Sequence, residues 1–398
     1  MKKFGRKFNL MMAVMLITVL VLAGCAKTEP ATTEEQPAEQ AAAEDVIKIG
    51  VFEPLTGANA AGGAIELEGM ELANELYPEV LGKKVELVVV DNKSDKVEAA
   101  NAAARLIEKE KVAAIIGSWG SSLSMAAGDA VRNAEVPAIG ASCTNPLVTL
   151  NNDYYFRVCF IDPFQGTVMA NYAINKLDAK TAAIIQEISS DYSVGLAKFF
   201  TDAFKELTGN ENAILGSASY NTGDQDFTAQ LTNIKQLNPD VIFAPGNFTE
   251  SALLIKQARQ LGIEIPILGG DTWETPEFIE IGGEAVEGTV LSTFFTSEVP
   301  ITEMSKEFLD AYRAKYNKEP ASVTALGFDA YIMLLNAIEK ANSTDPKAIR
   351  DALAETTDFM GAAGIITLDE NGDAVKSAVI KVVKDGKFTY LDTVEPIK

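Results

Sequence analysis

The sequence contains no histidine among its 398 residues. Histidine is the usual general base near neutral pH, so its absence excludes Ser-His-Asp and Cys-His mechanisms and most zinc and transition-metal sites. The chain also lacks a G-x-S-x-G elbow, a P-loop, and a G-x-G-x-x-G motif between a strand and a helix. With 56 carboxylates present, a lone Asp-Glu pair is most simply a solvated surface. We therefore expect a protein that is not an enzyme and that uses no metal or cofactor.

Cysteine is scarce, and the 34 basic residues are outnumbered by 56 acidic residues. Three cysteines cannot build a disulfide framework, and Cys143 and Cys159 are consistent with either a disulfide or two buried thiols. The formal net charge of −22 argues against nucleic acid and against an anionic membrane surface as partners. Apolar residues make up 47% of the chain. A chain of this size and composition favours two medium-sized domains.

Only one long hydrophobic run occurs, and it lies at the N-terminus. Lys2, Lys3, Arg6 and Lys7 precede the run Leu10 to Leu22, which is shorter than the roughly 20 residues of a membrane span. The run ends in Leu22-Ala23-Gly24-Cys25, which resembles a bacterial lipobox, in which the cysteine is diacylated and becomes the first mature residue. An ordinary signal peptide or an anchor with a chance cysteine is the alternative. We predict a lipoprotein signal peptide at 1–24, and a lipid anchor at Cys25 that holds the mature protein outside the cytoplasm, at the cell surface or in the periplasm.

The segment after this cysteine is polar and simple. Residues 25–45 consist mainly of Ala, Thr, Glu, Gln and Pro and lack aromatic side chains. Such a segment buries too little apolar surface to offset its ordering entropy, so we predict a flexible stalk. Folded structure should begin near Val46.

From Val46 onward, strand and helix patterns alternate in two successive series. Short aliphatic runs such as Val85 to Val90 are typical of parallel strands that are buried on both faces. The pattern predicts an α/β fold with two doubly wound, Rossmann-like lobes. The predicted strands are 47–52, 85–90, 112–116 and 136–139 in the first series, and 182–185, 214–220, 241–244 and 265–268 in the second. The predicted helices are 64–76, 96–109, 122–133, 194–207, 227–237 and 250–261.

Two loops of the first series are rich in hydroxyl groups. Residues 117–122 and 141–146 each follow a predicted strand, and neither contains Lys or Arg. Backbone N–H groups at a helix N-terminus, together with serine hydroxyls, form an anion site. Helix capping is the structural alternative for each Ser or Thr. The loops together favour a site for one carboxylate rather than for a phosphate.

The motifs in the folded part, taken in order, resemble the leucine/isoleucine/valine-binding protein family. These are type I periplasmic substrate-binding proteins of ABC importers for branched-chain amino acids. The resemblance covers about Val46 to Tyr390. It is carried by Gly50-Val51-Phe52-Glu53-Pro54-Leu55-Thr56-Gly57, Ile115-Ile116-Gly117, Val136-Pro137-Ala138-Ile139, Tyr155-Phe156-Arg157, Asp191-Tyr192-Ser193-Val194-Gly195, Gly223-Asp224-Gln225-Asp226-Phe227, Gln257-Ala258-Arg259-Gln260-Leu261-Gly262 and Gly269-Gly270-Asp271.

The resemblance implies two lobes that are joined by three hinge crossovers and close on a ligand. It places the crossovers near 160–164, 291–296 and 359–364. The first lobe would then comprise 46–162 plus 294–360, and the second lobe 163–293 plus 361–398.

The resemblance also implies roles for individual residues. Ser121 and Thr144, with backbone groups of Ser142 and Cys143, would hold an α-carboxylate. Asp271 would pair with the α-ammonium group, with a turn or N-cap role as its alternative. The other implied contacts are Tyr192, which would close over the ligand, and Asn247 or Phe248 at an aromatic position; Trp119 and Ser122 are further candidates.

Two departures from the family pattern bear on the ligand. The first loop reads Asn59-Ala60-Ala61-Gly62-Gly63 where relatives that hold leucine often have an aromatic residue, and Asn247 replaces a second aromatic residue. We therefore expect an amino acid, with the branched-chain amino acids as one case and another small carboxylate as the alternative. The expected mechanism is capture by domain closure by a monomer that docks on an ABC permease in the membrane. A sensory receptor and, less favoured, an extracytoplasmic enzyme are the alternatives.

Overall fold

The computed structural model describes residues 46–396. The predicted signal peptide, the stalk and the lipid-anchor residue Cys25 lie outside the described residues. Within 46–396, no helix combines the length and the hydropathy that crossing a bilayer requires.

The first sheet has six strands in the order β2-β3-β1-β4-β5-β6. All neighbouring pairs are parallel except β2 with β3, which is a short antiparallel edge pair. Apart from that edge strand, chain order and spatial order differ only where β3 lies outside β1, which is a doubly wound arrangement. The strands are β1 (Ile47–Glu53), β2 (Glu79–Val80), β3 (Lys83–Asp91), β4 (Ala114–Ile116), β5 (Ala138–Gly140) and β6 (Tyr155–Arg157).

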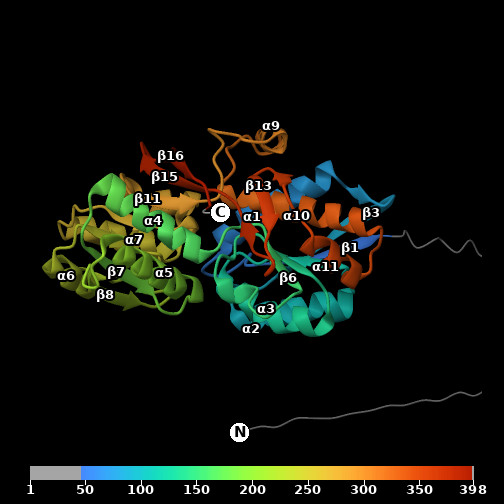
Figure 1. Ribbon diagram of the computed structural model, residues 1–398, viewed down its shortest axis with the longest axis horizontal. Helices are drawn as coiled ribbons and strands as arrows, with labels where there is room; N and C mark the ends of the chain where they lie inside the picture. Colours follow the sequence, from blue (N-terminus) through green and yellow to red (C-terminus); the bar gives the residue numbers. More distant parts are fainter. Residues whose placement is uncertain (1–45, 397–398) are drawn as a thin grey trace, which may run out of the picture. The chain divides into compact units, whose positions relative to one another are not determined.

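Helices from two distant parts of the chain pack on this first sheet. α1 and α10 lie against each other, and α11 packs on α10 (Figure 1). We refer to this sheet and its helices as the first lobe. The helical segments are α1 (Ala60–Leu76), α2 (Lys96–Arg105) with the π turn η1 (Leu106–Glu110), α3 (Ser121–Ala134), the 3₁₀ turn η2 (Pro146–Val148), α9 (Glu303–Tyr316), α10 (Ser322–Ala341) and α11 (Pro346–Ala354).

The second sheet has seven strands in the order β16-β15-β11-β10-β9-β7-β8. The run from β8 to β11 is parallel and repeats the topology of the first sheet, whereas β15 and β16 add antiparallel strands at one edge. The strands are β7 (Ala182–Glu187), β8 (Ile214–Tyr220), β9 (Val241–Phe243), β10 (Ile267–Gly269), β11 (Val290–Thr293), β15 (Ala378–Lys384) and β16 (Lys387–Val394).

Helices α4 to α8 accompany the second sheet and complete the second lobe. Their bounds are α4 (Asp162–Leu177), α5 (Asp191–Thr208), α6 (Thr228–Leu237), α7 (Phe248–Gln260) and α8 (Pro276–Gly282), with 3₁₀ turns η3 (Asp271–Trp273) and η4 (Gly283–Val286). Two lobes with parallel sheets confirm the predicted fold class.

The chain passes between the lobes three times. The first passage leads from β6 into α4, and the second leads from β11 to α9. The sequence placed the third passage at 359–364. In the structure, that segment belongs to a small sheet of β12 (Phe359–Gly361), β13 (Gly364–Leu368) and β14 (Ala374–Val375), and β12 packs on α9 and α10. The chain enters the seven-stranded sheet only with β15, at Ala378.

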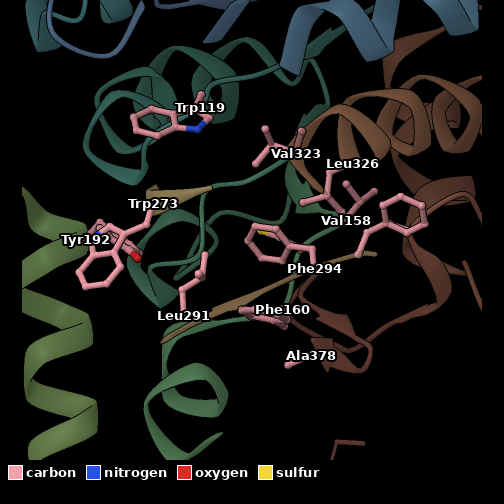
Figure 2. Packing of buried hydrophobic residues seen from close by; sticks show 14 of the residues in the cluster. Trp119, Val158, Phe160, Tyr192, Trp273, Leu291, Phe294, Val323, Leu326 and Ala378 are labelled. Atoms are coloured by element: carbon pink, nitrogen blue, oxygen red, sulfur yellow. The ribbon is translucent and has the colours of Figure 1, made fainter. Parts of the chain in front are cut away.

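Buried aromatic residues and one buried lysine hold the passages together. Phe160 in the first passage lies beside Phe294 in the second, with ring centroids 4.5 Å apart (Figure 2). Lys376, at the start of the third passage, donates from Nζ to the Phe294 carbonyl at 3.2 Å. The three connections therefore form one packed layer between the lobes.

Candidate ligand-binding site between the lobes

A cavity of about 90 Å³ lies where the two sheets face each other. It is lined from the first lobe by residues after β1, β3, β4 and β5, and from the second lobe by residues at the end of or after β7 and after β8, β9 and β10. The strand order reverses between β1 and β4 in the first sheet and between β7 and β9 in the second, so the cavity includes both of these points. Such topological switch points are where open α/β sheets bind ligands. The space is sufficient for several water molecules or for one small solute.

Hydroxyl groups and a helix N-terminus form the wall of the first lobe. Ser121 and Ser122 are the first two residues of α3, and Ser142 follows β5; all three line the cavity. The Ser121 hydroxyl accepts a hydrogen bond from the Asn145 N–H at 3.1 Å, which joins the two predicted loops. Unpaired N–H groups and the positive end of the helix dipole at this position favour an anion.

Trp119 provides the apolar part of the same wall. Its side chain is only 2% exposed, and it meets Phe248 of the second lobe edge to face, with centroids 6.1 Å apart. Gly62 is required here, because a Cβ at that position would overlap the Trp119 indole. The loop after β4 thus places an aromatic side chain at the cavity, whereas residues 59–63 contain none.

The wall of the second lobe contains a buried carboxyl group behind a tyrosine. Tyr192 lines the cavity and donates from its hydroxyl to Asp271 Oδ1 at 2.9 Å. Gln165 Nε2 donates to the same oxygen at 2.7 Å. Burial raises the pKa of Asp271 to about 6, although these two hydrogen bonds lower it. Gly270 allows this approach, because a Cβ there would overlap the Tyr192 hydroxyl.

Glu187, at the end of β7, is a second acidic residue at the cavity. It is fully buried, and its carboxylate accepts from the Thr222 hydroxyl and from the Asn247 N–H. Burial raises the pKa of Glu187. The second lobe thus presents acidic groups opposite the hydroxyls and helix N-terminus of the first.

Two further carboxyl groups lie behind the hydroxyl wall. Glu53 ends β1 and accepts from the Trp119 N–H at 2.7 Å, whereas Glu66 on α1 accepts from the Ser142 hydroxyl. Both side chains are fully buried, and burial raises the pKa of each, that of Glu66 to about 8. Glu66 is therefore largely protonated at neutral pH, and the burial of Glu53 opposes its ionisation, so the pair resists placing two negative charges beneath an anion site.

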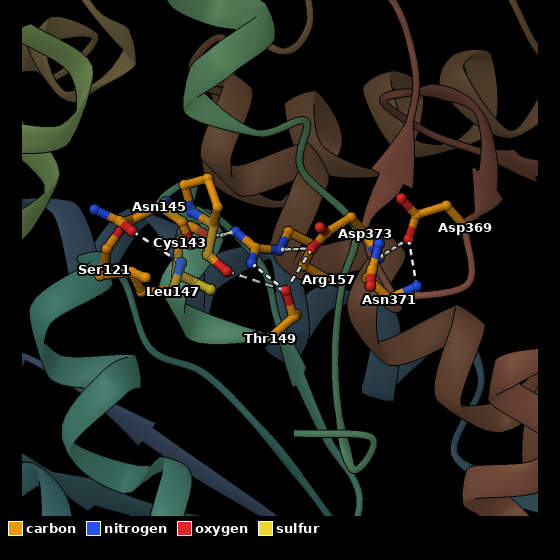
Figure 3. A network of polar contacts seen from close by, with 10 residues as sticks. Ser121, Cys143, Asn145, Leu147, Thr149, Arg157, Asp369, Asn371 and Asp373 are labelled. Atoms are coloured by element: carbon orange, nitrogen blue, oxygen red, sulfur yellow. Dashed lines mark hydrogen bonds and ion pairs between the residues drawn. The ribbon is translucent and has the colours of Figure 1, made fainter. Parts of the chain in front are cut away.

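Arg157 fixes the second hydroxyl-rich loop from behind (Figure 3). Its side chain is fully buried, and its guanidinium donates to the carbonyls of Cys143 and Asn145 at 2.6 and 3.0 Å. Its Nε lies 2.7 Å from Asp373 Oδ1, and a further N–H donates to the Thr149 hydroxyl. The arginine turns the loop carbonyls away from the cavity and ties the loop to the segment before the third passage.

The predicted site residues divide into two groups. Trp119, Ser121, Ser122, Ser142, Tyr192 and Asn247 line the cavity. Cys143, Thr144, Phe248 and Asp271 lie behind that lining, and all four are buried. Cys143 and Cys159 are both free thiols, and the hydrogen bond between them lowers the pKa of Cys143 to about 7. Among residues 46–396, no cluster of side chains has the composition of a metal site.

Several contributing residues were not anticipated from the sequence. Glu66, Gln165 and Glu187 lie on elements that the sequence identifies only as helix or strand, and a buried carboxyl group has no sequence signature among 56 acidic residues. Arg157 had a usable signal, because an arginine at the end of a buried strand needs a buried partner.

The arrangement suits a small zwitterion. A carboxylate would meet hydroxyls and backbone N–H groups on one side, and an ammonium group would meet carboxylates and a tyrosine hydroxyl on the other.

Comparisons with known proteins agree with this geometry. The family model described as "Periplasmic binding protein" matches residues 46–387. A "Leu/Ile/Val-binding protein homolog 2" of Brucella abortus is 30% identical, over 86% of this chain and 93% of its own length. The "Leucine-, isoleucine-, valine-, threonine-, and alanine-binding protein" of Pseudomonas aeruginosa is 28% identical, over 83% of this chain and 88% of its own.

Solved structures extend the similarity to three dimensions. A leucine-binding protein from Thermotoga maritima is 46% identical with a TM-score of 0.85, and the match covers 88% of this chain and 99% of that one. A branched-chain amino acid transporter substrate-binding protein from Streptococcus pneumoniae, solved with isoleucine, is 35% identical with a TM-score of 0.82 and coverage of 88% and 100%.

Proposed function

Because this chain belongs to the periplasmic binding protein family, we propose that it captures a free α-amino acid between its two lobes and delivers it to an ABC importer. The observation that carries the proposal is the placement of the cavity at the switch points of both sheets. Hydroxyl groups face it from one lobe and buried carboxyl groups from the other, which matches the two charged ends of an amino acid.

We assign the α-carboxylate to the first lobe. The protein groups that would bind it are the hydroxyls of Ser121 and Ser142 and the N–H groups at the start of α3 and in loop 141–146. Thr144 and Cys143 contribute through their backbone and through loop packing, since their side chains lie behind the cavity lining.

We assign the α-ammonium group to Asp271 in the second lobe. Its carboxylate lies directly behind Tyr192, so a small rotation of the tyrosine ring admits the ammonium group to Oδ1. A cation at this position would lower the pKa of Asp271 from about 6 and keep the carboxylate ionised. Glu187 and Asn247 bound the other side of the same space.

The ligand side chain would then lie against Trp119. The indole, with Phe248 behind it, supports an aliphatic side chain, and branched-chain amino acids are one class that fits. The relatives from Thermotoga and Streptococcus, whose names cite leucine and isoleucine, support this class. Asn59, Thr222 and Asn247 add polar groups to the lining, so short polar amino acids such as threonine belong in the same test.

The proposed role includes a location and partners. A periplasmic binding protein acts outside the cytoplasm, and we propose that a lipid at Cys25 holds this one near its permease. It acts as a monomer and performs no chemistry on its ligand. A sensory receptor that passes closure to a signalling protein is the alternative use of the same site.

A thermal-shift panel tests the proposal. Purified protein is unfolded and refolded to strip any carried-over ligand, and its Tm is then measured with each of the twenty amino acids and with small organic acids. A ligand at about 100 times its Kd adds roughly 2.7 kcal/mol to the free energy of unfolding, which raises Tm by several degrees. A rise with a few α-amino acids, and with neither their deaminated nor their decarboxylated analogues, supports the assignment. A folded protein whose Tm responds to none of them refutes it.

A further inference from the structure

Asp191 lies at the seam between the lobes, at the edge of the cavity. It is the first residue of α5 in the second lobe and directly precedes Tyr192. Its Oδ2 accepts a hydrogen bond from Lys96 Nζ at 2.8 Å and another from the Ser122 hydroxyl at 2.8 Å. Lys96 begins α2 and Ser122 lies in the first turn of α3, so both donors belong to the first lobe.

The backbone of the same residue contacts the first lobe twice more. The Asp191 N–H donates to the Ser122 hydroxyl at 2.9 Å, and the Asp191 carbonyl accepts from Asn145 Nδ2 at 2.8 Å. Three separate segments of the first lobe therefore converge on one residue of the second. Within residues 46–396, we find no other residue of β7–β11 or their helices that joins three first-lobe segments in this way.

The surroundings favour a negative charge at this position. Asp191 and Ser122 both lie in the first turn of a helix, where the positive end of the dipole stabilises an anion. Burial acts to raise the pKa of Asp191, but the hydrogen bonds from Lys96 and Ser122 outweigh it and lower the pKa. The Asp191 side chain remains 41% exposed and that of Lys96 53%, so the ion pair by itself contributes little to folding.

A weak contact has a large effect when it exists in only one of two states. These contacts can form only while the lobes are together, so their whole free energy acts on the equilibrium between the open and closed forms. Asp191 itself does not line the cavity, whereas its neighbour Tyr192 does. Replacing Asp191 therefore changes how long the cavity stays shut without removing a lining side chain, whereas its partners Lys96 and Ser122 do line the cavity.

We infer that Asp191 is a positioning residue that clasps the two lobes and sets the lifetime of the bound ligand. We refer to Asp191 with Lys96, Ser122 and Asn145 as the lobe clasp. This inference rests on the proposed function in taking an amino acid as the ligand, but the clasp itself is a property of the two lobes.

The test compares two aspartates on the same helix. Asp191→Ala removes the cross-lobe carboxylate, whereas the control Asp202→Ala removes an exposed carboxylate that pairs with Lys198 within α5. Association and dissociation rates are followed by stopped-flow fluorescence, because Trp119 lines the cavity and is one of only two tryptophans. We expect Asp191→Ala to raise koff about tenfold with kon changed less than twofold, and Asp202→Ala to leave both rates unchanged.

Lys96→Gln provides a second variant from the opposite lobe, in case Asp191→Ala weakens α5 itself. In a double-mutant cycle, Lys96→Gln should raise koff in the wild type and have little further effect in Asp191→Ala. Unchanged koff in both single variants, or fully additive effects in the double variant, overturns the clasp.

The two proposals fail in different ways. If the wild type binds amino acids and koff is insensitive to Asp191, the clasp is wrong and the proposed function stands. If the wild type binds none of them, the proposed function is wrong, and the clasp is judged by X-ray scattering on ligand-free protein. Asp191→Ala must then have a larger radius of gyration than both the wild type and Asp202→Ala, and equal radii overturn the clasp.

Discussion

At the scale of single residues, Asp271 carries the assignment of the ammonium group. Asp271→Asn keeps the shape of the side chain and the contact with Tyr192 but removes the charge. Truncating one partner of a buried charge pair costs about 2–5 kcal/mol, and each 1.4 kcal/mol is tenfold in affinity. We expect affinity for α-amino acids, measured by calorimetry, to fall at least about 25-fold, while Tm without ligand does not fall.

The matched control for this variant is Asp226→Asn, which changes a fully exposed aspartate of the same lobe. It should bind as the wild type does. An Asp271→Asn protein with wild-type affinity would remove Asp271 from the site and leave Glu187 as the acidic group at the cavity.

Glu66 predicts a pH dependence of stability. Its pKa is about 8 in the folded protein and near 4.5 when exposed, so folding takes up a proton between these values. The stabilisation from this group is complete below about pH 4.5 and is lost as pH rises through 8. We expect Tm to fall between pH 5 and 8.5, and Glu66→Gln to flatten that slope.

The readout is Tm across the pH range for the wild type, Glu66→Gln and Glu211→Gln. The last variant changes a side chain that is 90% exposed and should retain the wild-type slope. The same slope in all three proteins would mean that Glu53 or another buried acid takes up the proton.

The residues that sequence reasoning identified were those in loops or in the first turn of the helix that follows a strand. Ser121, Ser142 and Tyr192 follow predicted strands, so their placement at the cavity follows from the doubly wound topology. Site residues inside helices and strands were not identified, because their role depends on which face of the helix or strand packs against the adjacent element. Glu66 is one acidic position in a helix that contains several, and only the packed structure shows that it lies under Ser142.

At the scale of elements, Arg157 links strand β6 to the hydroxyl-rich loop. Arg157→Met removes the donors to two loop carbonyls and leaves Asp373 buried without its cation. Breaking a buried ion pair from one side costs about 3–5 kcal/mol. We expect that loss of stability in urea unfolding, together with weaker ligand binding because loop 141–146 is no longer held.

A second substitution separates the two effects. Adding Asp373→Asn to Arg157→Met removes the stranded charge and should restore part of the stability but not the affinity. Arg313→Met, which breaks an exposed pair with Glu319, is the control and should change stability by less than about 1 kcal/mol. Restored affinity in the double variant would contradict a role for Arg157 in holding the loop.

Most helices and strands could be predicted from the sequence, but their boundaries were predicted less accurately. β8 was predicted at its observed bounds, whereas α1 begins at Ala60 rather than 64 and α5 at Asp191 rather than 194. Gly62 and Gly63 lower the helix propensity of the first turn of α1, and tertiary packing overrides this. The segment that the resemblance assigned to the third passage contributes to the short strands β12 and β13, which have no strong sequence pattern of their own.

At the scale of the whole molecule, the excess of acidic residues predicts a response to salt. A formal charge of −22 produces self-repulsion that destabilises the compact state. Raising NaCl from 20 to 300 mM shortens the Debye length to below about 10 Å and screens this repulsion. We expect Tm to rise by several degrees. The salt is a chloride rather than a sulfate, because sulfate stabilises folded proteins by its exclusion from their surface. A Tm that falls as NaCl is raised would contradict the expectation.

The two-lobed fold was predictable at this scale. For the site between the lobes, the polar loops were predictable but their pairing across the lobes was not. The polar loops of each lobe can be recognised from the sequence. No sequence pattern, however, predicts which loop of one lobe faces which loop of the other. Asn145 and Asp191 belong to separate lobes and meet only because three passages place them there. That is why the lobe clasp emerged from the structure alone.

The contact between Gly62 and Trp119 has a consequence for the evolutionary history of the site. A side chain at position 62 collides with the indole, so an aromatic residue fits at position 62 only if the tryptophan is exchanged for something smaller. Each single change is unfavourable alone, and only the pair is tolerated. The two positions are thus epistatic, and descendants of this chain are expected to change cargo through substitutions elsewhere in the lining before they change this pair.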